Sequence, residues 1–203
     1  MNIARILYPV RVLGPGGRVG IWLCGCHRKC RGCSNPELWE PKAEYEMDTG
    51  SILELLHTVA RENKIDGFTI SGGEPMEQTE ELAALVGGLV QISRDIILYS
   101  GFELHELLER NDPPTERILR SIAVLIDGPY IEGRNRGVPL RGSDNQRVHI
   151  MNKGYRGIYD AYLGGAQNRI QNFQATDGVV SVGIHKPGFV VELSESLADH
   201  EKG

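Results

Sequence analysis

The feature that most constrains this chain is the clustering of its cysteines. All four cysteines of the 203-residue sequence lie within ten positions, at Cys24, Cys26, Cys30 and Cys33. Clustered thiols indicate a disulfide framework, a zinc site or an iron-sulfur site. Any fold of this chain must therefore present these thiols on one short loop.

Disulfides are the least expected of the three alternatives. Disulfide-stapled domains are usually small, secreted and cysteine-dense, whereas this chain is long enough to bury a full core and starts without an apolar signal segment. Its 40% hydrophobic and 24% charged residues are typical of a globular protein, and no apolar run is long enough to cross a bilayer. We therefore expect a cytoplasmic protein that does not bind membranes, and its formal charge of -5 indicates no general attraction to nucleic acid.

The spacing of the last three cysteines favours an inorganic cluster. Cys26-x3-Cys30-x2-Cys33 supplies three thiolates from one loop, in which Gly25 and Gly32 permit tight turns close to a bulky group. Three thiolates on a four-iron cluster leave one iron without a protein ligand, so that iron is free to bind substrate. Cys24 is interpreted as a buried residue at the end of the preceding strand. A zinc or ferredoxin-like site that also uses Cys24 remains an alternative at this point.

This C-x3-C-x2-C spacing resembles the cluster motif of the radical S-adenosylmethionine (SAM) enzymes. The resemblance implies that Cys26, Cys30 and Cys33 are the ligands of a [4Fe-4S] cluster. It also implies that the fourth iron binds the amine and carboxylate of the methionine part of SAM. The cofactors expected from the resemblance are therefore the cluster and SAM.

A second motif follows one strand-helix unit after the cysteines, as it does in radical SAM enzymes. The apolar segment 67–71 predicts a strand that runs into Gly72-Gly73-Glu74-Pro75, before a predicted helix over 77–93. This order places backbone amides and a carboxylate at the C-terminal end of a strand, where parallel α/β folds bind ligands. The resemblance assigns Gly72, Gly73 and Glu74 to the amino group of SAM, and the two motifs together argue against the zinc alternative.

The remaining pattern predicts the fold class. Strands and helices alternate about four times, and a capping box at Ser51 to Glu54 predicts the start of the first helix. Because the strands are apolar throughout, we expect an α/β fold with a parallel sheet under an outer layer of helices. The resemblance narrows this fold to the partial parallel (β/α) barrel of radical SAM enzymes. We expect a core domain over residues 1–150 with one cluster, and a C-terminal extension of unknown role over residues 151–203.

Three further segments resemble, more narrowly, the activating component of anaerobic ribonucleotide reductase. They are G-P-G-x-R at residues 14–18, N-P-x-x-W at 35–39 and the stretch from 124 through R-G-S-D-N-Q to 149. Pro129 and Asp144 depart from that pattern, in which a lysine and a serine stand at these positions. Ser100 and Asp127 lie at the ends of predicted strands, and Asn145 and His149 lie in the last of these segments. The resemblance suggests that these four residues make further contacts to the cofactor.

The resulting hypothesis is a radical SAM activase. The resemblance implies that it cleaves SAM and generates a glycyl radical on a partner enzyme such as anaerobic ribonucleotide reductase, with a flavodoxin-type reductant. It assigns the chain's own side chains no catalytic role beyond holding the cluster and SAM. The alternatives are a radical SAM enzyme that modifies a peptide or small molecule, and a metal-binding interaction module. The extension has no cysteine, and nothing in it indicates chemistry.

Overall fold

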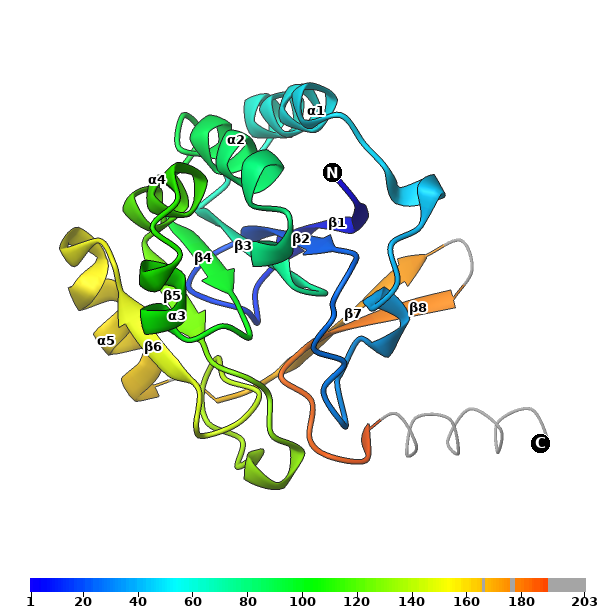
Figure 1. Ribbon diagram of the computed structural model, residues 1–203, viewed down its shortest axis with the longest axis vertical. Coiled ribbons are helices and arrows are strands. Elements are labelled where there is room, and N and C mark those ends of the chain that lie inside the picture. Colours follow the sequence, from blue (N-terminus) through cyan, green and yellow to red (C-terminus); the bar gives the residue numbers. More distant parts are fainter. Residues whose placement is uncertain (166, 176–177, 190–203) are drawn as a thin grey trace.

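The computed structural model describes residues 1–165, 167–175 and 178–189, and the predicted extension therefore lies partly outside the described residues. Its centre is a six-stranded sheet in the order β1-β2-β3-β4-β5-β6 (Figure 1). The strands are β1 (Ile3–Val10), β2 (Arg18–Leu23), β3 (Gly67–Gly72), β4 (Ile96–Tyr99), β5 (Val124–Asp127) and β6 (Arg147–Ile150). The four central strands run parallel, and β1 and β6 pair antiparallel at the two edges.

The prediction of a mixed α/β fold around parallel strands is confirmed. The antiparallel edges were not predicted, and the sheet is not closed on itself because β1 and β6 are its two outer strands. The strand predicted over 67–71 corresponds to β3, which extends one residue further, to Gly72.

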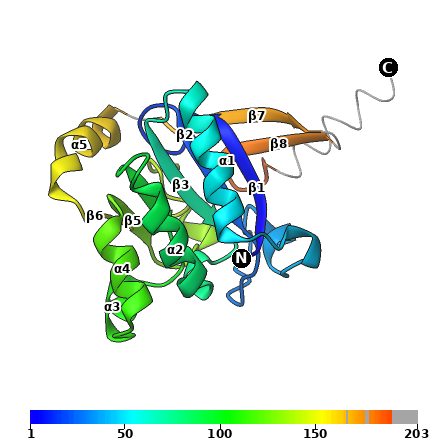
Figure 2. The same ribbon diagram turned by 90° about the horizontal axis from the view of Figure 1, so that it is seen from above.

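Helices α1 to α4 cover one face of the sheet (Figure 2). The α-helices are α1 (Thr49–Glu62), α2 (Thr79–Leu89), α3 (Leu104–Glu109), α4 (Pro113–Ser121) and α5 (Arg156–Gly165). Five short 3-10 turns are η1 (Pro36–Leu38), η2 (Ala43–Tyr45), η3 (Pro75–Glu77), η4 (Glu132–Arg134) and η5 (Lys153–Tyr155). Leucine and isoleucine side chains of α1, α2 and α4 pack against alternate residues of the strands to form the largest core cluster. None of the helices within the described residues has the length and apolar character needed to cross a bilayer.

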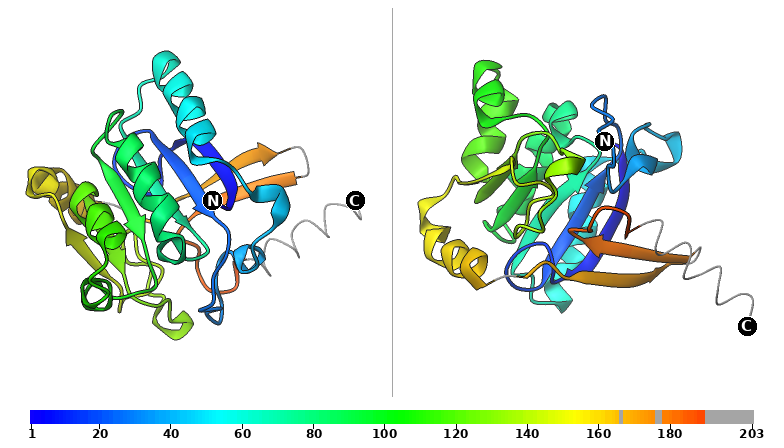
Figure 3. Two further views of the ribbon diagram at one scale, coloured as in Figure 1. Left: turned by 45° about the horizontal axis from the view of Figure 1, so that its top comes forward. Right: turned by 90° about the horizontal axis from the view of Figure 1, so that it is seen from below.

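The other face of the sheet is covered by the C-terminal extension. The hairpin of β7 (Ile170–Ala175) and β8 (Gly178–Gly183) packs Val182 into a second cluster with Val10 and Trp22 (Figure 3). Helix α5 buries Tyr159 in a third cluster with residues of β4 and β5. The described part of the extension is therefore packed on the sheet.

Candidate metal and cofactor site

The two predicted motifs meet at the C-terminal edge of the parallel strands. The cysteine loop leaves β2 at Leu23, and Gly73 and Glu74 directly follow β3. An open cavity of about 170 Å³ lies at this edge, and Cys26, Cys30 and Cys33 all line it. This is the location at which open α/β sheets bind ligands.

Backbone hydrogen bonds hold the cysteine loop in place. The N–H of Gly25 donates to Leu38 O over 2.8 Å, and the N–H of Cys26 donates to Trp39 O over 2.8 Å. Gly25 has φ +107°, which side-chain-bearing residues rarely adopt. The segment after the cysteines therefore folds back onto the start of the loop, which places Trp39 beside the thiols.

The thiol of Cys24 is separated from the other three. It is 1% exposed, its Sγ donates a hydrogen bond to Glu40 O over 2.9 Å, and it does not line the cavity. Burial raises the pKa of the Cys24 thiol, which favours the neutral form. This geometry agrees with the interpretation of Cys24 as a structural residue.

Burial also raises the pKa of Cys26 and of Cys33, and this effect exceeds the opposing effect of nearby backbone N–H groups. Metal binding requires thiolates, so loading this site would release protons. Among the described residues, no three Cys, His, Asp or Glu side chains surround a single metal ion. A cluster needs no such single centre, because it offers a separate iron to each thiolate.

Two buried donors support the fit of an anionic group in this cavity. Trp39 Nε1 and Arg28 Nε line it with no hydrogen-bond partner of ordinary geometry among the residues that the structure describes. The indole N–H of Trp39 nevertheless lies close enough to Cys33 to lower the pKa of that thiol in part. Buried donors without partners are costly unless a ligand completes them. A thiolate-bound cluster and a ligand carboxylate would supply the missing acceptors.

The glycines of the G-G-E-P motif bring β3 close to the cysteine loop. Gly73 N–H donates to Leu23 O over 2.8 Å, and Glu74 N–H donates to Gly25 O over 2.8 Å. A Cβ atom on Gly73 would lie 2.2 Å from Gly25 O, so a side chain does not fit there. Gly72 has φ +113° and is equally restricted. The motif therefore positions the cysteine loop, in addition to the cofactor contact predicted for it.

The carboxylate of Glu74 connects the ends of two strands. Its Oε1 accepts from Met76 N–H and from Ser100 Oγ, each over 2.9 Å, and its Oε2 accepts from Gly101 N–H over 2.6 Å. Burial raises the pKa of Glu74 despite these three donors. Glu74 and Ser100 line the cavity together, so the structure brings these two predicted residues into direct contact.

Three other predicted residues do not line this cavity. Asp127 Oδ2 accepts from Leu104 N–H over 2.7 Å and lies 2.9 Å from His149 Nε2, at an angle unsuited to a hydrogen bond. Asn145 Nδ2 donates to Pro129 O over 2.8 Å. These contacts support the loops behind the cavity wall. A direct cofactor contact by Asp127, Asn145 or His149 stays a prediction.

The two departures from the resembled motif are placed as follows. Pro129 accepts the bond from Asn145, and Asp144 Oδ1 accepts from Arg134 Nε over 2.6 Å at a partly exposed pair. Asp144 therefore forms an ion pair on a surface loop and does not line the cavity.

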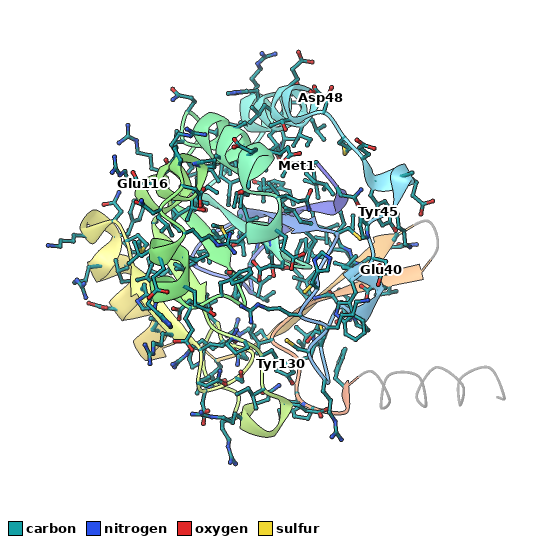
Figure 4. All side chains as sticks on the ribbon, in the orientation of Figure 1. Met1, Glu40, Tyr45, Asp48, Glu116 and Tyr130 are labelled. Atoms are coloured by element: carbon teal, nitrogen blue, oxygen red, sulfur yellow. The ribbon has the colours of Figure 1, made fainter. Side chains whose placement is uncertain are left out.

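Sequence reasoning missed several residues that line the cavity. Arg28 places its guanidinium carbon 4.2 Å from the ring centroid of Phe102 and extends into the cavity wall. Tyr130 follows β5 and lies at the strand-end side of the molecule (Figure 4). The extension contributes residues 181–185, although nothing in it indicated chemistry. No periodicity or motif signals that a distant hairpin returns to this edge.

Comparison with known proteins agrees with these features. The family model described as 4Fe-4S single cluster domain matches residues 12–149. Proteins called anaerobic ribonucleoside-triphosphate reductase-activating protein are similar to this chain. The one from Enterobacteria phage T4 is 32% identical over 153 residues, covering 73% of this chain and 93% of the relative. The one from Vibrio cholerae serotype O1 is 34% identical over 154 residues, covering 70% and 94%. The hairpin β7–β8 lies outside the region that the family model matches.

Proposed function

This chain belongs to the family of the anaerobic ribonucleoside-triphosphate reductase-activating proteins and carries their 4Fe-4S single cluster domain, and from this premise we propose that it is a radical SAM activase. One observation supports the proposal most strongly. Three thiols, the G-G-E motif and the buried N–H groups of Trp39 and Arg28 all line one cavity. The proposed partner is an anaerobic ribonucleotide reductase, and the proposed fold is a partial barrel of the radical SAM type.

The residues that line the cavity would have two separate roles. Cys26, Cys30 and Cys33 would hold a [4Fe-4S] cluster, and Gly72 to Glu74 would contact the methionine part of SAM. When bound, the cluster and SAM would supply an electron and an adenosyl radical that removes a hydrogen atom from a glycine of the reductase. A flavodoxin-type reductant is the proposed electron source, and the cytoplasm is the proposed location.

Two side chains of the cavity wall would complete the site. The indole N–H of Trp39 would donate to the sulfur of Cys33, a kind of contact that tunes iron-sulfur centres. Arg28 would direct its unpaired N–H toward an anionic ligand such as the methionine carboxylate. The apolar side chains of Leu13 and Trp22 line the same cavity and would exclude water from it.

Formation of a glycyl radical tests this function. The iron-loaded protein is incubated without oxygen with SAM, a flavodoxin-type reductant and the anaerobic ribonucleotide reductase of the same organism. We expect an electron paramagnetic resonance (EPR) signal of a carbon-centred radical on the reductase. Cys30→Ala should abolish the signal, and Cys24→Ala should retain it because Cys24 lies outside the cavity.

Two results would contradict the proposal. SAM cleavage without a radical on the reductase would favour an enzyme that modifies another peptide or a small molecule. Absence of SAM binding would favour a metal-binding interaction module.

A further inference from the structure

The second strand of the C-terminal hairpin presents a free edge to a groove. Val179, Val180 and Ser181 are consecutive residues of β8, and all three line a second cavity of about 530 Å³. Successive side chains of a strand point to opposite faces. A cavity lined by three consecutive residues therefore lies along the edge of the strand. This edge makes no backbone hydrogen bond to any other described residue, since the ladder of β8 is formed with β7 alone.

The opposite wall of this groove is the cysteine loop. Residues 32–37 line it, including the ligand candidate Cys33. The groove and the cysteine cavity share Cys33, Tyr130, Ser181 and His185 among their lining residues, so the two spaces adjoin each other. A chain lying along β8 would therefore be directed toward the thiols. Figure 1 shows the hairpin, in orange, beside the blue segment that follows the cysteines.

The hairpin is anchored firmly enough to act as a template. Gln171 of β7 accepts from Arg11 N–H over 2.9 Å and donates to Pro9 O over 2.7 Å. Val182 of β8 is buried against Trp22, and Asn135 Nδ2 donates to His185 O over 2.8 Å. Because Gln171 pairs with Val182, these contacts all lie at the C-terminal end of β8 and fix that end relative to the sheet.

We propose that the free edge of β8 binds an extended segment of the reductase by adding it as a third strand to the hairpin. This inference rests on the proposed function and identifies the surface that the partner polypeptide uses. Unpaired strand edges are templates for another strand, and peptide recognition by strand addition combines backbone hydrogen bonds with side-chain pockets.

The lining of the groove fits this occupant. Val179 is 66% exposed and offers an apolar contact to an incoming side chain. The charged residues of the lining are of both signs, with Arg5 and Lys186 opposed by Glu37 and Glu132. Such a lining does not have the one-sided positive charge that a nucleic acid requires. His185 and Ser181, whose Nε2 and Oγ lie 3.0 Å apart, stand at the junction with the cysteine cavity.

Amide hydrogen-deuterium exchange on the full-length protein tests the proposal. The free protein is compared with the protein saturated with the intact reductase. Within residues 178–183, the alternate N–H groups that point away from β7 should exchange at least tenfold more slowly in the complex, because strand addition pairs them. Val179→Asp should weaken reductase binding at least tenfold. The matched control is Ile170→Asp, which places the same charge on β7 at a residue that lines neither cavity and should leave binding unchanged.

The outcomes separate this inference from the function on which it rests. Reductase that binds and receives the radical while β8 exchanges as before would overturn the strand addition alone. Equal weakening by Val179→Asp and Ile170→Asp would overturn it as well. Protection of β8 on raising the concentration of this protein by itself would assign the edge to a second copy, again against the proposal. A reductase that neither binds nor receives a radical would overturn the proposed function together with the inference.

Discussion

At the residue scale, Cys24 differs from its three neighbours in what surrounds its sulfur. Its thiol donates to a backbone carbonyl in the interior, whereas the thiols of Cys26, Cys30 and Cys33 line the cavity. The spacing alone did not exclude Cys24 as a fourth ligand. Its contacts favour a structural role, because they give the thiol a partner inside the protein and keep it out of the cavity lining.

We predict that alanine variants of the four cysteines differ in the iron that they retain. Cys26→Ala, Cys30→Ala and Cys33→Ala each remove a thiolate, so reconstituted protein should lose most of its iron and sulfide. Cys24→Ala should keep the cluster, because it removes only a buried hydrogen bond. Iron and sulfide analysis after anaerobic reconstitution measures this, and a cluster lost equally in all four variants would contradict the assignment.

The functional residues that belong to a sequence motif were predictable, and those outside a motif were not. The cysteine spacing and G-G-E-P motif predicted that the thiols and Glu74 would lie at one edge, and the structure places them there. Two of the three donors to the Glu74 carboxylate were not predictable, since Ser100 and Gly101 belong to another strand end. Arg28 was missed because its role depends on the position of Phe102 in space.

At the scale of single elements, the helix starts show how local chemistry decides a boundary. The predicted capping box at Ser51 to Glu54 is wrong. Asp48 is the N-cap of α1, and its Oδ2 accepts from Ser51 N–H over 2.9 Å (Figure 4). An aspartate three residues before Ser51 is an equally good cap and adds a favourable charge at the N-terminus of the helix. The helix therefore begins earlier than the sequence pattern indicated.

Helix α4 has the same kind of cap, which leads to a prediction about pH. Asp112 Oδ1 accepts from Thr115 N–H over 2.9 Å, and this hydrogen bond lowers the pKa of Asp112 below its ordinary value of 3.8. Asp112→Ala should lower the free energy of unfolding by about 1 kcal/mol near pH 7. The difference should shrink as the pH falls below 3.8 and through the lowered pKa, because protonation removes the charged acceptor. Urea denaturation of both proteins measures it.

The control for this prediction is Asp112→Asn. An amide oxygen still caps the helix but does not titrate, so its smaller effect on unfolding should not change with pH. A loss in Asp112→Ala that stays constant to about pH 2 would contradict the assigned cause.

The other elements were predictable where the local sequence has a clear hydrophobic pattern. Apolar runs identified β2 to β5 because buried parallel strands are apolar on both faces. The antiparallel pairing of β1 and β6 was not predictable, since it depends on which sheet edge each strand reaches. The same limit applies to β8, whose place beside the cysteine loop depends on the folded sheet.

At the scale of the whole molecule, a buried network connects the extension to the sheet. Arg18 is 0% exposed, its Nη1 donates to Asp95 Oδ2 over 3.0 Å and its Nη2 donates to Phe68 O over 2.6 Å. The hydroxyl of Tyr159 on α5 donates to the same Asp95 carboxylate. The network therefore ties α5 to the N-terminal ends of the parallel strands, at the edge opposite the cysteine cavity.

We predict that this ion pair has a large effect on stability. Arg18→Met leaves the buried carboxylate of Asp95 without its cation and should lower the free energy of unfolding by about 3–5 kcal/mol. Arg120→Met removes an exposed pair to Glu116 within α4 and should cost less than about 0.5 kcal/mol. Urea denaturation of the two variants makes the comparison, and equal losses would contradict a special role for the buried pair.

The most direct test of the account is low-temperature EPR of anaerobically reconstituted, reduced protein, recorded without and with SAM. The central claim is that the cysteine cavity holds a four-iron cluster with one iron free for SAM. We predict a reduced four-iron signal that changes when SAM is added. A cluster signal that is indifferent to SAM, or zinc in place of iron in metal analysis, would contradict the claim.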